Sequence, residues 1–408
     1  MLVQSVFLFG FEHSLNYFFN KFRSQNSKKV LVSTQSIFIV VSFLLFSFIS
    51  SPLLSSKVEN INLILLWGGL SLLFVYWSTL LKVNMDVEVF VKSQMLQSLV
   101  LLGLVYLFVV FYALSLIGVI YANIATFFIT ILFMYGFIKQ FVSWSFNINL
   151  LKKVLAYGLP LMPSGALLWA SMQLDRYFIL YFLDEYALGM YSFALAVVMI
   201  PLFLKTAVKS AIDPFIMKCF HKNADSAKLI ISNYFTLSLI VFCFLFLFLS
   251  LFSHDVVMIM GGEKYLDSTS YIPWLLLIST ITVCNQYFVY GINFAKRNGY
   301  ILKGLLYMLF INVVLMVFLI EFLSIYGVLV ANLVANIFYT IYLVWQSNKL
   351  YRIVHHKRRN LGIFLSTLIV FISNFYVFPE SYLFKFVTLL VFVGFNMKTL
   401  IFIKRQIA

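Results

Sequence analysis

The stretch YGLPLMPSGALLWASMQLDRYFILYF, residues 157–182, places prolines and charged groups inside a strongly apolar segment. Most of its residues are apolar enough to lie in the hydrocarbon core of a membrane. Two prolines stand near its start, and a carboxylate and a guanidinium, Asp175 and Arg176, follow each other further along. Because a charge inside a membrane helix is costly, this pair requires a functional or a structural explanation.

The composition of the whole chain is that of a protein embedded in a membrane. Of the 408 residues, 63% are hydrophobic and only 11% are charged, and the mean hydropathy is +0.99. A soluble globular protein of this length does not have such a composition. The apolar runs do not alternate with polar residues, which argues against a membrane β-barrel. The sequence therefore predicts an all-α polytopic membrane protein.

Apolar runs near the length of about 20 residues that a spanning helix requires recur along the chain. We predict thirteen transmembrane helices, and the first is the least regular because it contains Glu12, His13 and Asn16. The expected spans are 1–20, 30–51, 61–81, 94–115, 117–138, 156–182, 190–216, 229–252, 271–294, 302–322, 326–347, 361–377 and 381–403.

The positive charges of the loops support this set of spans. When the loops are assigned alternately to the two sides of the membrane, nearly all their Lys and Arg fall on one side, and the other side has only Lys57 and Lys264. The positive-inside rule makes the basic side cytoplasmic, and the C-terminus lies there. The formal charge of +15 is thus explained by topology and gives no reason to expect nucleic-acid binding.

Two segments with the same pattern indicate an internal repeat. IGVIYANIAT (117–126) and YGVLVANLVA (326–335) align Gly118 with Gly327 and Asn123 with Asn332. The weaker pair LNYFFNKF (15–22) and IDPFIMKC (212–219) follows the same order. Chance similarity between apolar helices is the alternative, but both pairs also agree in membrane direction.

The repeat predicts two parallel six-helix lobes, related by an axis along the membrane normal. We expect residues 1–150 to form an N-terminal lobe with five helices, and 151–348 a C-terminal lobe with six. Residues 349–408 would form a basic cytoplasmic loop and two further transmembrane helices. The counterpart of the 156–182 helix is expected to precede Met1, giving fourteen helices in the full-length protein.

The 157–192 region resembles the helix that opens the second lobe of Wzx-type polysaccharide (O-antigen) flippases of the MATE-like exporter superfamily. GGEKYLDSTSYIPWL (261–275) and YGVLVANL (326–333) are weaker matches to the same family. Its second helix often carries an Arg where this chain has Asn16, after Gly10 and Glu12. The main motif matches at Gly158, Pro160, Pro163, Ser164, Asp175, Arg176, Tyr177, Gly189, Tyr191 and Ser192.

Charged residues in two predicted helices are the candidate site. Asp175 would lie about 22 Å along a helix that starts at Pro160, so Arg176 either faces a cavity beside its counter-ion or snorkels to the membrane surface. Lys205, Lys209 and Asp213 recur every fourth residue along one helix face. They either bind an anionic substrate or form an ordinary intrahelical pair. Charge of this kind suits a phosphate.

Three carboxylates are candidates for ion coupling or for acting as counter-ions. They are Asp175, Asp213 and Glu12, and the weaker repeat aligns Glu12 with Lys209. Glu12 would take up a proton or a sodium ion, or simply pair with His13 or a lysine. The three Cys and the His355–His356 pair lack metal-site spacing, and we expect no metal, no cofactor and no catalytic residues.

The resemblance implies a transporter rather than an enzyme. It would move an undecaprenyl-pyrophosphate-linked oligosaccharide, an O-antigen or capsule repeat unit, across the bacterial inner membrane by alternating access. The expected partners are this lipid-linked oligosaccharide, membrane lipids, and a polysaccharide polymerase and chain-length regulator. A membrane-embedded polymerase or ligase, or a MATE-type drug/cation antiporter, remains the alternative. The sequence does not specify the sugar, the coupling ion or the oligomeric state.

Overall fold

The computed structural model describes residues 6–22, 24–55, 59–159, 162–222, 224–295, 297, 299–353, 356–376 and 381–407. These residues form helices joined by short turns, and no strand occurs among them. The predicted all-α architecture is therefore confirmed. The chain divides into two compact units, Met1–Ala170 and Ser171–Ala408.

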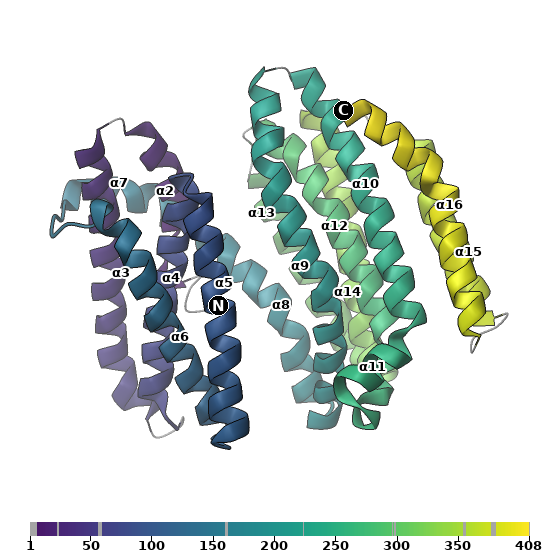
Figure 1. The fold of residues 1–408 in the computed structure, drawn as a ribbon, viewed down its shortest axis with the longest axis horizontal. Coiled ribbons are helices and arrows are strands. Elements are labelled where there is room, and N and C mark those ends of the chain that lie inside the picture. The colour runs from purple at the N-terminus through teal and green to yellow at the C-terminus, as the bar shows by residue number, and fades with distance from the viewer. Residues whose placement is uncertain are drawn as a thin grey trace. The chain divides into compact units, whose positions relative to one another are not determined.

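Among the described residues, the first unit contains eight helical segments between Phe11 and Gly158, and it also holds the start of α8 (Met162–Phe182). Figure 1 shows them as the purple to blue ribbons. The segments are α2 (Phe11–Lys21), α3 (Gln25–Leu54), α4 (Ile61–Val83), α5 (Val87–Val105) with the π-helical η1 (Tyr106–Phe111), α6 (Ser115–Ile138) with the 3₁₀ turn η2 (Lys139–Phe141), and α7 (Ile148–Gly158).

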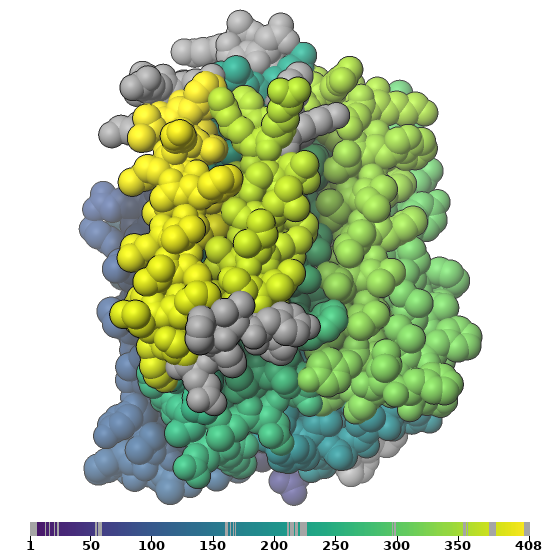
Figure 2. All heavy atoms as spheres, turned by 90° about the vertical axis from the view of Figure 1, so that its right-hand side faces the viewer, coloured from purple at the N-terminus to yellow at the C-terminus, as the bar shows by residue number. Residues whose placement is uncertain are grey.

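The second unit contains the rest of α8 and the helices that follow it. Its C-terminal pair packs against α10, and Figure 2 shows these two helices side by side on one face. The elements are α9 (Glu185–Lys222), α10 (Ala224–Leu251), α11 (Ser253–Gly261), η4 (Glu263–Ser270), α12 (Ile272–Phe294), α13 (Gly299–Leu323), α14 (Ile325–Leu350), α15 (Lys357–Tyr376) and α16 (Tyr382–Ile407).

Ten helices in the described residues are long and apolar enough to cross a membrane. They coincide with ten of the thirteen predicted spans. The other three predicted spans, 1–20, 156–182 and 361–377, contain α2, α8 and α15, which do not meet the same criterion. The chain is a multi-pass membrane protein, and thirteen crossings stay a prediction. The predicted boundaries of the lobes stay a prediction too, since the division into units falls inside α8.

The start of the 156–182 span differs from the sequence-based expectation. Residues 148–158 form a separate helix, α7, where the sequence analysis placed a cytoplasmic loop, and α8 begins only at Met162. A physical reason is at hand in the sequence, because Pro160 comes directly after the C-cap residue Leu159. A proline has no backbone N–H to continue the helical hydrogen bonds, and its ring clashes with the carbonyl four residues before it. Leu151 and Val154 of α7 are buried while Lys152 and Lys153 are exposed, as in a helix lying at a membrane surface.

A close backbone approach holds α7 in the first unit. Gly10, with a left-handed φ of 67°, lies against Gly158 so closely that a Cβ on Gly10 would come within 2.2 Å of the Gly158 carbonyl oxygen. A side chain at either position would force the backbones apart. The motif glycine Gly158 therefore has a packing role.

The two glycines of the predicted repeat serve the same purpose in different hairpins. A Cβ on Gly327 would come within 2.3 Å of the Leu319 carbonyl oxygen, where α13 turns into α14. A Cβ on Gly118 would come within 3.1 Å of the Phe108 carbonyl oxygen, where η1 turns into α6. Each glycine thus lets the end of one helix touch the start of the next, which gives the sequence match a structural counterpart in each unit.

Candidate functional site

Asp175 is buried in the second unit, with 8% of its surface exposed. It lies on α8, and its Oδ2 accepts hydrogen bonds from the Tyr191 hydroxyl of α9 at 2.6 Å and from Asn332 Nδ2 of α14 at 2.7 Å. Charge-assisted bonds of this length are strong. The carboxylate therefore links three helices of the second unit.

The hydrogen-bond network continues across the α13–α14 hairpin. Asn312 of α13 donates from Nδ2 to Asn332 Oδ1 at 3.1 Å, and Asn336 donates to the Asn332 main-chain oxygen at 2.9 Å. All three asparagines are buried. Asn332, noted in the sequence only as a repeat position, is thus the central residue of the network.

Two oxygens of this network have no hydrogen-bond partner among the described residues: Asp175 Oδ1 and Asn312 Oδ1. A buried acceptor without a partner carries a desolvation cost of about 1–3 kcal/mol, and more for a charged group. A proton on Asp175 or a small cation bound by the oxygens would offset that cost. The described residues contain no group of three or more His, Cys, Asp or Glu side chains able to hold a metal ion.

Arg176 has different partners from the neighbouring carboxylate. Its Nη1 donates to Gln173 Oε1 at 3.4 Å, and its half-buried side chain has no partner for Nε among the described residues. Asp175 is turned into the unit toward Tyr191 and Asn332. The sequence suggested a counter-ion pair, but the hydrogen bonds of the two side chains go to other residues.

The lysine pair lies on one uninterrupted helix, α9. Lys205 is half-buried and Lys209 is exposed. The Asp213 side chain lies outside the described residues, so a Lys209–Asp213 pair is not described. Glu12 is half-buried on α2 in the first unit. Substrate binding by Arg176, Lys205 and Lys209, and ion coupling by Glu12, Asp175 and Asp213, stay predictions.

Sequence reasoning did not find roles for Tyr191, Asn312 and Asn332. Tyr191 was part of the family motif, and Asn332 part of the repeat, but neither pattern indicates contact with Asp175. Asn312 gave the weakest signal, a single amide in an apolar helix. Such a residue indicates an interhelical hydrogen bond, although the partner cannot be read from spacing alone.

Comparisons with known proteins agree with this architecture. Residues 19–270 match the family described as Polysaccharide biosynthesis protein. Among curated proteins, no sequence match is found. Solved structures share the fold: the lipid II flippase MurJ in an inward closed conformation superposes with a TM-score of 0.72 at 13% identity, covering 100% of this chain and 90% of MurJ.

Multidrug transporters share it as well. The MATE transporter VcmN of Vibrio cholerae has a TM-score of 0.62 at 16% identity over 85% of this chain and 83% of its own. A multidrug resistance MATE family transporter of the MOP superfamily, in an outward-facing conformation, gives 0.61 at 16% identity over 86% and 85%. At these identities the likeness establishes the fold, which is that of membrane transporters.

Proposed function

The chain belongs to the polysaccharide biosynthesis protein family, and from that premise we propose that it is a flippase for an undecaprenyl-pyrophosphate-linked oligosaccharide. The head group, an O-antigen or capsule repeat unit, crosses from the cytoplasmic to the outer leaflet of the bacterial inner membrane while the lipid tail stays in the bilayer. The lobes expose the substrate site alternately to the two sides, and the C-terminus is cytoplasmic. A polymerase and a chain-length regulator act on the exported product.

The observation that carries this proposal is the match of the whole chain to the fold of MurJ, whose name describes it as a lipid II flippase. The family match adds a link to polysaccharides. The descriptions of the two MATE transporters mention no polysaccharide. The same proposal gives Arg176, Lys205 and Lys209 a role, since a pyrophosphate-linked cargo is anionic and needs cations along its path.

We assign the ion-coupling step to the Asp175 network. Its carboxylate is buried on α8 and, among the described residues, accepts hydrogen bonds through one of its oxygens, from Tyr191 of α9 and Asn332 of α14. Uptake or release of a proton or sodium ion at Asp175 changes the charge of the carboxyl group that accepts hydrogen bonds from Tyr191 and Asn332. The strength of these bonds changes with it, and so does the packing of α8 against α9 and α14. Glu12 and Asp213 are the other candidates for coupling or charge balance.

The alternatives predict different substrates. A MATE-type antiporter would confer resistance to cationic drugs without affecting surface polysaccharide. A polymerase or ligase needs catalytic acids on its outer side, and the longest predicted outer segment, near residues 253–270, folds into the short helices α11 and η4. Measurement of surface polysaccharide and of drug susceptibility in the same flippase-deleted strain separates the three functions.

Replacement of Lys209 by Ala should reduce oligosaccharide export several-fold while leaving the amount of inserted protein unchanged. The exposed side chain makes no packing contribution that its loss would remove, and one cation fewer lowers the insertion cost. Surface polysaccharide, normalised to the amount of protein in the membrane, is the measurement.

Lys209→Arg retains the charge with altered geometry and should keep part of the activity. The competing explanation is an intrahelical pair, for which Lys209→Ala combined with Asp213→Ala restores full export. Full activity of the single Ala variant, or full rescue by the double variant, removes Lys209 from the substrate path.

A further inference from the structure

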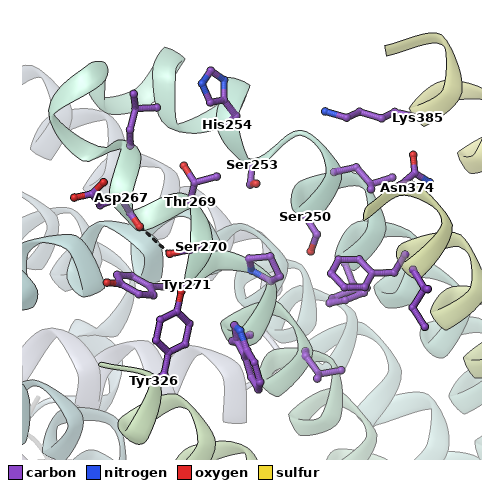
Figure 3. A pocket seen from close by; sticks show the side chains of 18 residues that line it. Ser250, Ser253, His254, Asp267, Thr269, Ser270, Tyr271, Tyr326, Asn374 and Lys385 are labelled. Carbon is purple, nitrogen blue, oxygen red and sulfur yellow. Dashed lines mark hydrogen bonds between the residues drawn. The ribbon is translucent and has the colours of Figure 1, made fainter. Parts of the chain in front are cut away.

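The second unit contains a pocket of about 1060 Å³ that lies apart from the Asp175 network. Figure 3 shows its wall residues, which come from the end of α10, from α11 and η4, and from the facing ends of α12, α14, α15 and α16. The distribution of Lys and Arg places the 253–270 segment on the outer side of the membrane. The pocket then opens where an exported head group arrives.

Aromatic rings form one wall of this pocket. Trp274, Tyr271 and Tyr326 all line it. The Tyr271 and Tyr326 ring centroids are 5.5 Å apart at 70°, and those of Trp274 and Tyr326 are 6.5 Å apart at 72°. The crossed rings pack edge to face. The flat face of an aromatic ring of this kind packs well against an apolar surface such as the C–H face of a sugar ring.

Polar groups without partners lie in the same walls. Ser250 on α10 is 8% exposed and Asn374 on α15 is 2% exposed, and both line the pocket. Ser250 Oγ, Asn374 Oδ1 and Thr269 Oγ1 have no hydrogen-bond partner among the described residues. Buried polar atoms are nearly always paired, so three orphans around one pocket point to a ligand with several hydroxyl groups.

Charged and aromatic contacts fix the rim. Lys385 extends from α16 over the pocket, with its Nζ 5.3 Å from the centre of the Tyr382 ring (Figure 3). The Tyr382 hydroxyl donates to Asp255 Oδ1 of α11 at 2.8 Å, and the Tyr186 hydroxyl donates to Asp267 Oδ2 of η4 at 2.7 Å. These bonds link α16 to α11 and α9 to η4, the two short helices beside the pocket.

We propose that this pocket binds the saccharide portion of the exported glycolipid on the outer side of the membrane. Small-molecule sites combine apolar walls with a few convergent polar groups and typically enclose about 300–1,000 Å³, so this one has room for more than one sugar ring. Trp274 stacks on a ring, Ser250, Thr269 and Asn374 exchange hydrogen bonds with hydroxyls, and Lys385 donates at the rim. The identity of the saccharide as the exported head group rests on the proposed flippase function.

The test is binding of a lipid-free, phosphate-free probe. This probe is the repeat-unit oligosaccharide, released by mild-acid hydrolysis of the glycosyl phosphate bond in the host's undecaprenyl-pyrophosphate-linked intermediate. Calorimetric titration uses the full chain in lipid nanodiscs. Trp274→Leu should weaken binding at least tenfold, because the packing of the sugar's C–H face on the indole ring is lost along with a rigid wall. Trp345→Leu is the matched control, since Trp345 is an exposed tryptophan on α14 outside the pocket and its replacement should leave the affinity unchanged.

Lys385→Gln is a second variant, at the rim of the pocket, that leaves the aromatic wall unchanged. It should weaken binding several-fold even if Trp274→Leu fails to fold. Unchanged affinity in Lys385→Gln together with unchanged affinity in Trp274→Leu overturns the proposal, as does no binding of the probe to the wild type. Binding of undecaprenyl phosphate to the pocket without the oligosaccharide also overturns it, in favour of a lipid head-group site.

The two proposals fail separately. Lys209→Ala should impair export but leave probe binding intact, because Lys209 does not line the pocket. A wild type that exports oligosaccharide but does not bind the probe refutes the pocket and leaves the flippase in place. Probe binding that depends on Trp274 in a protein that exports nothing supports a saccharide site and refutes the flippase.

Discussion

Asp175→Asn should abolish at least nine-tenths of the export activity while the protein inserts and folds normally. Asn keeps the size of the side chain and an oxygen that accepts from Tyr191 and Asn332, so the links between α8, α9 and α14 persist. It removes the buried negative charge and with it a desolvation cost, so the thermal stability should be equal or higher. It also removes the ability to take up a cation, and that is the step assigned to Asp175.

Asp184→Asn is the matched control for this variant. Asp184 is an exposed carboxylate in the same unit, and its Oδ1 accepts from the Ala187 N–H at the start of α9. Asn serves in that position as well as Asp, so both stability and export should stay at the wild-type level. Export by Asp175→Asn near the wild-type level would leave Asp175 as a structural hydrogen-bond acceptor and transfer ion coupling to another residue.

Tyr191→Phe tests the same network by removing one donor and leaving the charge. Of its two side-chain partners among the described residues, Asp175 then retains Asn332, and a buried charged acceptor loses a hydrogen bond. We expect a loss of about 1–3 kcal/mol in stability, measured as a lower melting temperature in detergent. A melting temperature equal to that of the wild type would show that water or another group satisfies the carboxylate.

Much of the architecture could be predicted from sequence because the membrane imposes it. Backbone groups in lipid must be paired within a helix, so hydropathy alone located the ten helices that the structure bears out as candidate spans. Loop charge added a direction to each of them. The break between α7 and α8 was not predicted. Length and hydropathy identify an apolar segment, but they do not show where a short helix ends before the next one begins.

The candidate site was only half predictable, for a different reason. Asp175 was identified from the sequence because a carboxylate inside an apolar helix is rare and costly in a membrane. Its partners were not, because Asn332 is 157 residues away in the chain and the contact depends on how α8 and α14 pack. The same holds for Gly10 and Gly158, whose backbones meet only after α2 and α7 have folded together.

The repeat glycines show what a sequence match can add when the contact distance is known. The sequence alignment treats Gly327 and Gly118 as equivalent, but the structure shows that the space around their Cα atoms differs. The backbone of Leu319 lies 2.3 Å from the position of a Cβ on Gly327, whereas the nearest backbone atom for Gly118, the Phe108 oxygen, is 3.1 Å away. Close helix approach through small residues is the usual packing mode in membranes, and its cost on substitution scales with the overlap.

Gly327→Ala should therefore destabilise the second unit by about 2–3 kcal/mol, at the upper end of overpacking effects. A Cβ at this position meets backbone atoms of α13, which cannot rotate away, so the α13–α14 turn must open and carry Asn312 and Asn332 apart. A melting temperature several degrees lower in detergent, with reduced export at physiological temperature, is the expected result. Gly118→Ala should show a smaller decrease, because its neighbours need give only a few tenths of an ångström.

Gly189→Ala is the matched control for both variants. Gly189 lies in a helix of the same unit as Gly327, and nothing lies within 4 Å of a Cβ built on it. Ala is a better helix former than Gly by about 1 kcal/mol, so this variant should melt at the same or a higher temperature. If Gly327→Ala and Gly189→Ala melted alike, the α13–α14 contact would have to be looser than the backbone distances imply, and the shared glycine would mark ancestry or chance and not a packing requirement.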